Sequence, residues 1–226
     1  MGVQDSLGTW VSQPKGIAEA FTTFYQKLFE SSNPILGLIS MEKVVTDDMN
    51  AQLSQDFMEW EVEAALKWIA PLKAPSPYGM PPVFYQNYWN LVGNDVTKTI
   101  LSYLNSTTLP HPLNHTFISL IPKIKIPNAV TDYRHISLCN VLYKKFSKVL
   151  ANRLKKILPS IITEYQSAFT KNRLISDNIL VAFEILHSMN NHNSKKSGYM
   201  ALKLDMSKTY DRVEWCFLEE VMRNLG

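Results

Sequence analysis

The chain has 226 residues, of which 46% are hydrophobic and 19% are charged, and its formal net charge is +3. These proportions are ordinary for a globular protein with one large domain or two small ones. They argue against a membrane protein, because no run of about 20 apolar residues occurs, and the polar residues 1–10 do not form a secretion signal. Cys139 and Cys216 are too few for a disulfide framework, so we expect an intracellular protein.

The positive charge is concentrated in the middle of the chain. Residues 122–176 hold eleven basic side chains against only Asp132 and Glu164, which gives this segment a net charge of +9. A basic segment of this kind is typical of a surface that binds a polyanion. A solvated helix face without any ligand has the same composition, and the charge alone does not distinguish the two.

Helical spacing dominates the first half of the chain. An amphipathic helix is predicted over residues 14–30, loop-like structure over 31–50, and a second helix over 59–70. Five prolines within 71–82 exclude regular structure there. We expect two helical pieces to follow, with a break near Gly93.

The spacing changes to that of strands in the middle of the chain. Residues 115–127 alternate and are rich in isoleucine, and 132–138 are predicted to pair with them as a hairpin. A long helix is predicted over 140–158. Its expected core stripe is Leu142, Phe146, Val149, Leu150, Leu154 and Ile157. The basic residues expected on its other faces are Lys144, Lys145, Lys148, Lys155 and Lys156.

Two helices and a strand are predicted towards the C-terminus. A helix begins at Ser176 or Asp177, residues 199–205 alternate as a strand, and 213–225 form a final helix. The inward-facing residues of the first of these helices are expected to be Ile179, Phe183, Leu186 and Met189. Because helices dominate the first half and strands appear later, the predicted fold class is α+β with an incomplete antiparallel sheet.

One acidic residue is placed where it can meet a metal ion. Asp205 ends the predicted strand 199–205, and carboxylate oxygens suit Mg²⁺. Phosphoryl transfer with two metal ions needs several carboxylates, so Asp205 alone does not complete such a site. A helix cap or an ordinary loop charge remains the alternative for Asp205. We interpret the other acidic pair, Asp47 and Asp48, as part of a solvated loop.

Five stretches of the sequence follow one another in a recognisable order. They are "LNHTFISLIPK" (113–123), "YRHISLCNVLYKKFSKVLANRLKKILP" (133–159), "YQSAF" (165–169), "RLISDNILVAFEILH" (173–187) and "LKLDMSKTYDRVEW" (202–215). In this order they resemble the reverse transcriptases of plant LINE-type (non-LTR) retrotransposons. Residues 20–34 and 71–89 also resemble segments that precede the polymerase in this family.

The resemblance implies a right-hand polymerase of which this chain holds the fingers and the beginning of the palm. The implied divisions are a helical extension over 1–70, a connector over 71–112, fingers over 113–198 and the first palm segment over 199–226. The implied activity is RNA-directed DNA synthesis from an RNA template, a DNA primer and deoxynucleoside triphosphates. Mg²⁺ is the implied cofactor, and the nucleus or the cytoplasm is the implied location.

The same resemblance assigns roles around the incoming nucleotide. Asp205 and the Met206 carbonyl would bind Mg²⁺, and Tyr210 would lie beneath the sugar. Lys123 and Arg134 match positions that contact the triphosphate. Without the resemblance, the residue types favour a core aromatic for Tyr210, a surface ion pair for Arg134 and a strand-edge charge for Lys123.

Contacts with nucleic acid are implied for a further set of residues. Gln166 and Arg173 match fingers positions near the template. The basic helix face would contact phosphates of the RNA template or the primer. The lysines of this face are Lys144, Lys145, Lys148, Lys155 and Lys156.

The sequence also departs from the family pattern. The substituted positions are Ser76, Tyr78, His135, Lys171, Asn172 and Thr209, and at several of them glycine or proline is usual. The family's Asp-Asp metal motif does not occur, so we expect the chain by itself to be inactive. The alternatives are a non-catalytic nucleic-acid-binding remnant that uses residues 122–176, a fragment that does not fold stably, and a mobile-intron maturase.

Overall fold

The computed structural model describes residues 2–35, 37, 41–73, 79–106, 111–168, 170, 172–191, 199–204 and 209–226. The chain divides into two compact units whose segments interleave along the sequence. The first consists of Met1–Ser31 with Ser54–Asn152, and the second of Ser32–Leu53 with Arg153–Gly226. Within the described ranges, no helix combines the length and the apolar composition needed to cross a bilayer.

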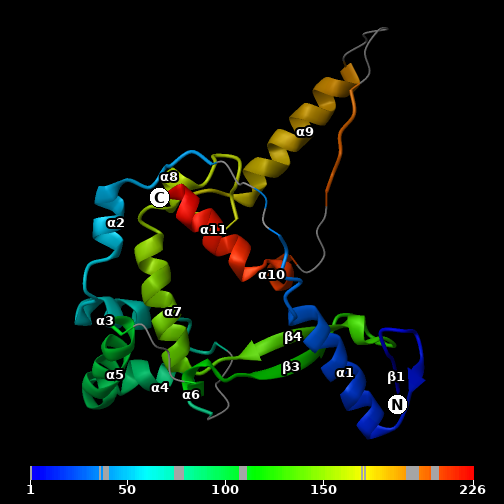
Figure 1. Ribbon diagram of the computed structural model, residues 1–226, viewed down its shortest axis with the longest axis horizontal. Coiled ribbons are helices and arrows are strands. Elements are labelled where there is room, and N and C mark those ends of the chain that lie inside the picture. Colours follow the sequence, from blue (N-terminus) through cyan, green and yellow to red (C-terminus); the bar gives the residue numbers. More distant parts are fainter. Residues whose placement is uncertain are drawn as a thin grey trace. The chain divides into compact units, whose positions relative to one another are not determined.

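Helices and a β-hairpin make up most of the first unit. Its elements are β1 (Val3–Gln4), β2 (Trp10–Val11), α1 (Pro14–Phe29), α3 (Glu59–Lys67), α4 (Pro82–Asn87), α5 (Trp89–Leu104), α6 (His111–Asn114), β3 (Phe117–Pro122), the 3₁₀ turn η1 (Val130–Asp132), β4 (Tyr133–Leu138) and α7 (Val141–Leu154), whose last two residues belong to the second unit. Figure 1 shows α3, α4 and α5 grouped beside α7. Val62 of α3, Val96 and Ile100 of α5 and Val149 of α7 form the core, each at most 8% exposed. Burial of one such side chain contributes about 1.5–3 kcal/mol.

The hairpin predicted for the middle of the chain is confirmed. Strands β3 and β4 pair antiparallel, in a register that places Phe117 opposite Leu138. Asp132 closes the connecting loop, because its Oδ2 accepts hydrogen bonds of 2.9 Å from the backbone N–H groups of Asn128 and Ala129. The donors at Ala129 and Asn128 hold the pKa of Asp132 below its usual value.

An aromatic cluster joins α1 to β4. The rings of Phe21 and Tyr133 meet edge to face, with centroids 5.0 Å apart. The ring of His135 contacts those of Tyr25 and Phe29, at centroid distances of 5.2 and 5.5 Å. Each such pair contributes about 0.5–1.5 kcal/mol beyond its buried area. His135, one of the departures from the family pattern, therefore has a packing role here.

The long helix predicted for the middle of the chain exists as α7, but it is turned about its axis. Its buried side carries Val141, Lys145 and Val149, which are spaced by four residues and at most 2% exposed. Leu150 and Leu154, which were predicted for the core, are 42% and 39% exposed. The predicted stripe is confirmed at Val149 and Ile157, which are 1% and 6% exposed, and is wrong at Leu150 and Leu154. The prediction assigned every lysine to the surface, whereas an aromatic site of the first unit accommodates Lys145.

Other expectations also differ from the structure. The helical break lies at Tyr88, between α4 and α5, and Gly93 is inside α5. Helix α2 (Asp47–Leu53) occupies part of the region predicted as loop, and the small β1–β2 pair was not predicted. Residues 199–204 belong to neither sheet of the described part of the chain, so the third predicted strand is not formed there.

The second unit joins residues 32–53 to the C-terminal part of the chain. Its elements are α2, α8 (Leu158–Ile161), α9 (Ile175–Asn191), α10 (Thr209–Arg212) and α11 (Trp215–Leu225). The backbone N–H groups of Val44 and Val45 donate to the Leu225 carbonyl at 3.0 and 2.9 Å. The Oε1 of Glu214 accepts hydrogen bonds from the backbone N–H and the hydroxyl of Ser32. We call residues 32–53 the N-terminal strap.

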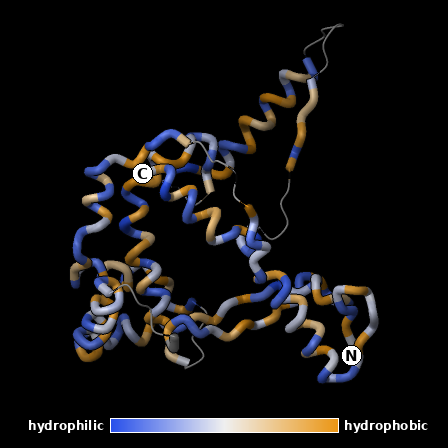
Figure 2. Tube along the Cα trace, in the orientation of Figure 1, coloured by the Kyte–Doolittle hydropathy of each residue, from blue (hydrophilic) through white to orange (hydrophobic). Residues whose placement is uncertain are grey.

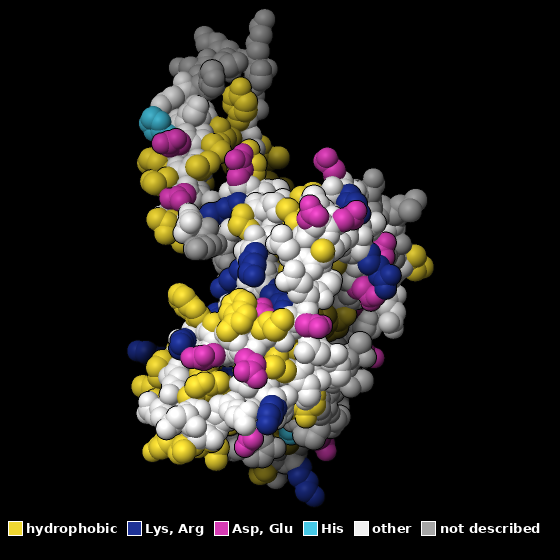
Figure 3. All heavy atoms as spheres, turned by 90° about the vertical axis from the view of Figure 1, so that its left-hand side faces the viewer, with side chains coloured by type: hydrophobic (Ala, Val, Ile, Leu, Met, Phe, Trp, Pro, Cys, Tyr) yellow, Lys and Arg dark blue, Asp and Glu magenta, His cyan; other side chains and the backbone are white. Residues whose placement is uncertain are grey.

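Helix α9 exposes apolar side chains around its circumference. Ile179, Phe183 and Leu186 were predicted to face inward but are 65%, 66% and 49% exposed, and Val181 on another face is 54% exposed. Figure 2 shows hydrophobic stretches along this helix. Figure 3 shows hydrophobic side chains exposed on the surface, interspersed with acidic ones. Exposed patches of this kind mark interaction surfaces or aggregation sites.

Candidate nucleic-acid and nucleotide-binding site

The residues expected to bind metal lie outside the described ranges. Asp205 and Met206 both fall between residues 204 and 209. Among the residues that the structure does describe, no group of three or more His, Cys, Asp or Glu side chains is arranged to hold a metal ion. The Mg²⁺ site therefore stays a prediction that rests on the resemblance.

Tyr210 lies on the surface of the second unit. It belongs to the short helix α10, and 80% of the residue is exposed. This exposure argues against a core aromatic, which was the alternative reading of the residue. Its role beneath a nucleotide sugar stays a prediction.

Lys123 and Arg134 both lie at the loop end of the β3–β4 hairpin. Arg134 lies directly opposite Ile121, and Lys123 follows Ile121 by two residues. Both cations therefore lie near the end of the hairpin at which β3 and β4 meet their connecting loop. The Nζ of Lys123 donates to the Thr131 carbonyl at 2.7 Å, which holds this side chain against the hairpin loop.

Arg173 organises the loop that precedes α9. Its Nη1 donates to the carbonyls of Thr163 and Gln166, at 2.5 and 2.7 Å, and its Nη2 to that of Ile162 at 3.4 Å. The guanidinium is thus committed to the backbone of the loop, and Nε2 of the exposed Gln166 donates to the Ala168 carbonyl at 3.5 Å. Arg173 is therefore a positioning residue for this loop.

The same loop explains one departure from the family pattern. Asn172 has a φ of 61°, in the left-handed region that glycine adopts most easily. Asparagine is among the non-glycine residues that tolerate this conformation best. The loop therefore keeps a backbone geometry suited to glycine although glycine is absent.

The predicted basic helix face does not remain intact. Lys144 and Lys148 are half-buried on α7, whereas Lys155 and Lys156 are exposed residues of the second unit. Lys145 is 0% exposed. Its assignment to a nucleic-acid-binding surface is wrong, because its ammonium group is not accessible to a phosphate.

Lys145 is held by two aromatic rings. Its Nζ lies 4.1 Å from the ring centroid of Trp89 and 5.1 Å from that of Tyr85. Burial lowers the pKa of Lys145 to about 7, while the two rings favour its charged form. The indole of Trp89 in turn covers Gly93, where a Cβ atom would lie 2.8 Å from ring carbons. The glycine thus allows Trp89 to fold back along its own helix and meet the lysine.

A groove of about 1010 Å³ opens between the end of α3 and one side of α7. We call it the Trp68 groove. Its lining includes Trp68, Leu72, Lys73, Tyr143, Lys144 and Lys148. Trp68 and Leu72 are 75% and 87% exposed, so that large apolar groups and cations lie along the same groove.

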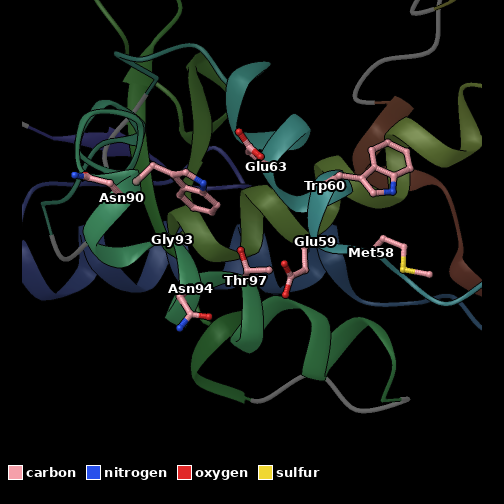
Figure 4. A pocket seen from close by; sticks show the side chains of 9 residues that line it. Met58, Glu59, Trp60, Glu63, Asn90, Gly93, Asn94 and Thr97 are labelled. Carbon is pink, nitrogen blue, oxygen red and sulfur yellow. The ribbon is translucent and has the colours of Figure 1, made fainter.

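A second groove, of about 740 Å³, lies between α3 and α5 and has the opposite charge. We call it the Trp60 groove. Figure 4 shows Glu59, Trp60 and Glu63 projecting from α3 and Asn90 and Asn94 from α5. No lysine or arginine contributes to its described lining. The two grooves therefore each contain an exposed tryptophan, one among cations and the other among carboxylates.

The chain is similar to known proteins, and the family match lies in its second half. Residues 121–226 match the family described as reverse transcriptase (RNA-dependent DNA polymerase). Over 218 residues the chain is 28% identical to the "Transposon TX1 uncharacterized 149 kDa protein" of Xenopus laevis. That similarity covers 93% of this chain but 16% of the transposon protein. Residues 121–226 are therefore similar to reverse transcriptases, in a chain that is similar over most of its length to a transposon protein.

Proposed function

We propose that this chain forms the fingers and the first palm segment of an RNA-directed DNA polymerase of a plant LINE-type (non-LTR) retrotransposon. The match of residues 121–226 to the reverse transcriptase family carries the proposal, and the similarity to a transposon protein supports it. The substrates would be an RNA template, a DNA primer and deoxynucleoside triphosphates. The place of action would be the nucleus or the cytoplasm.

The hairpin and α10 would contact the incoming nucleotide. Lys123 and Arg134, at the loop end of the hairpin, would neutralise charge on the triphosphate. The exposed ring of Tyr210 would pack beneath the sugar and leave no room for a 2′-hydroxyl. Asp205 and the Met206 carbonyl would hold Mg²⁺, which supplies charge stabilisation for phosphoryl transfer.

Nucleotide binding tests the hairpin assignment. A fluorescent deoxynucleoside triphosphate should bind the chain in the presence of an RNA–DNA template–primer. Lys123→Gln combined with Arg134→Gln should weaken this binding by about 10–100-fold, because charge-assisted hydrogen bonds are lost. Lys125→Gln is the matched control, since Lys125 is an exposed cation beyond the end of β3. An equal loss in the control would reject a specific triphosphate site.

Polymerase activity of the isolated 226-residue chain is not expected. Asp205 is the one carboxylate that the resemblance assigns to a site that needs several. Primer extension on an RNA template with Mg²⁺ should therefore give no product. Extension that requires Mg²⁺ and disappears in Asp205→Asn would contradict this expectation.

A second candidate function is non-catalytic binding of nucleic acid. The net charge of +9 over residues 122–176 favours it, together with the position of Lys144 and Lys148 along one groove. Binding of RNA should weaken steeply with salt, because released counterions contribute to the affinity. Charge reversal by Lys144→Glu with Lys148→Glu should abolish it. Binding that is weak and insensitive to salt would count against this function.

A further inference from the structure

Trp68, Leu72 and Lys73 line the Trp68 groove, and none of the functions proposed above gives them a role. Its rim places the exposed indole of Trp68 and the exposed side chain of Leu72 beside the cations Lys73 and Lys144. Exposed apolar area of this size is costly in water and is typically retained where a ligand covers it. The neighbouring cations indicate that this ligand is an anion with a flat apolar part.

Hydrogen bonds from α4 hold the rim in place. The Gln86 side chain donates from Nε2 to the carbonyls of Leu66 and Ile69, at 3.1 and 2.9 Å. These carbonyls flank Trp68, which is the C-cap residue of α3. The backbone N–H of Val83 donates to the Pro71 carbonyl at 3.2 Å. The indole is therefore carried on a backbone that is fixed before any ligand arrives, which lowers the entropy cost of binding.

The electrostatics of the groove favour a negatively charged ligand. Desolvation lowers the pKa of Lys144, Cys139 opposes this shift, and the nearby charge of Lys73 lowers the pKa further. Two like charges at one groove repel each other, and an anion between them would relieve that repulsion. Lys148 lies four residues after Lys144 on the same side of α7 and extends the positive lining by one helical turn.

We infer that the Trp68 groove binds a single-stranded nucleic acid, with an unstacked base on the Trp68 indole and adjacent phosphates at Lys73, Lys144 and Lys148. Single-strand binding requires two components, which are an exposed aromatic ring on which a base stacks and a basic groove that binds the phosphates. A duplex does not fit this chemistry, because its bases are already stacked on each other. The inference rests on the proposed function, since it names where a template or another single strand would lie.

The Trp60 groove provides an internal comparison. Trp60 is 62% exposed and lies on the same helix, but Glu59 and Glu63 line its groove. Carboxylates repel phosphates, so Trp60 should contribute nothing to nucleic-acid binding. Lys67 is the matching control for the lysines of the Trp68 groove. It is an exposed residue of α3, and its ammonium group pairs with Glu63 at 2.9 Å.

Fluorescence anisotropy with the complete 226-residue chain tests this site. The probes are a short labelled RNA, a DNA of the same sequence and the corresponding duplex. Trp68→Ala should weaken binding of both single strands by about 5–100-fold, and Trp68→Phe should restore most of it, because the ring is what stacks. Lys73→Gln with Lys144→Gln should reduce the slope of log affinity against log salt by about 1.4. Trp60→Ala and Lys67→Gln should leave both quantities unchanged.

The outcomes separate the groove from the wider proposal. Loss of single-strand binding in Trp68→Ala, with normal circular dichroism and a normal binding curve for Trp60→Ala, supports the groove. Binding that is retained in Trp68→Ala overturns the groove but leaves nucleic-acid binding elsewhere on the chain intact. An equal loss for the duplex overturns the stacking role of Trp68. Failure of the unaltered chain to bind any probe overturns both the groove and the nucleic-acid-binding function.

Discussion

Replacing Lys145 with methionine tests whether a buried ammonium group makes the stability of this chain depend on pH. Lys145 is 0% exposed, and its Nζ has no hydrogen-bond partner among the described residues. Burial lowers its pKa to about 7, whereas lysine in an unfolded chain has a pKa of ~10.4. Between these two values the unfolded state binds the additional proton, so a rise in pH stabilises the folded state.

The magnitude of this effect follows from the two pKa values. Each pKa unit corresponds to ~1.36 kcal/mol, and integration from pH 7 to about pH 9.5 gives ~3 kcal/mol of added stability. The rings of Trp89 and Tyr85 favour the charged form and act against the shift, so this figure is an upper value. Burial raises the pKa of Tyr85, which destabilises the folded state once the unfolded tyrosine ionises near pH ~10. The measurement therefore stays below that pH.

Urea unfolding, followed by circular dichroism, provides the measurement. Between pH 7 and about pH 9.5 the free energy of unfolding of the original chain should rise by ~2–3 kcal/mol more than that of Lys145→Met. Methionine keeps the length of the side chain and a favourable contact with the indole. Lys148→Met is the control, because Lys148 is on the same helix but half-buried. A parallel pH response of the original chain and Lys145→Met would refute the buried charge as the cause.

Three further changes have defined outcomes. Gly93→Ala should lower the free energy of unfolding by about 1–3 kcal/mol, because a Cβ would meet the packed indole at 2.8 Å. A urea titration measures this change, and Asn94→Ala, at the exposed neighbouring position, should change the free energy of unfolding little. Arg173→Ala should leave three backbone carbonyls without their hydrogen bonds and cost about 1.5–3 kcal/mol in local stability. Amide hydrogen exchange in the loop before α9 should become faster, and unchanged exchange would contradict the positioning role of Arg173. Ile179→Glu with Phe183→Glu should reduce aggregation in light scattering and leave the melting temperature nearly unchanged, and a large drop in that temperature would show that α9 is packed in solution.

The β3–β4 hairpin could be predicted because its signal is local. Alternating apolar residues and a turn-rich linker specify two paired strands, and the register follows from the loop. The helix α1 was predictable for the same reason, since Pro14 starts it and its spacing is regular. In both cases the elements are fixed by residues close together in the sequence.

The orientation of α7 could not be predicted, because it depends on a partner far away in the sequence. Hydrophobic spacing favoured the stripe that contains Leu150, whereas the structure buries Lys145. Only the presence of Tyr85 in α4 and Trp89 at the start of α5 makes an inward lysine acceptable. Sequence periodicity carries no information about such a distant aromatic site.

The candidate site was predictable in part. The motifs pointed to Lys123 and Arg134, and both lie at the loop end of the β3–β4 hairpin, while their contact with a triphosphate stays a prediction. Trp68 and Lys73 were missed, because Trp68 falls at the end of the predicted helix 59–70 and Lys73 lies within the proline-rich segment 71–82, for which no regular structure was expected. The one local signal for this groove in the sequence was a large aromatic residue, Trp68, next to a lysine at the end of a predicted helix.

The hydrogen bonds of the N-terminal strap have a consequence for how the chain folds on the ribosome. Ser32 and its acceptor Glu214 are 182 residues apart in sequence, and Val44 and Val45 bond to Leu225. At a synthesis rate of about 5–20 residues per second, the strap leaves the ribosome ~10–40 s before its acceptors exist. During that interval Ser54–Asn152 can complete its own core, because Val62, Ile100 and Val149 are by then available. Closure of the strap is then a late event of high contact order, and the second unit matures last.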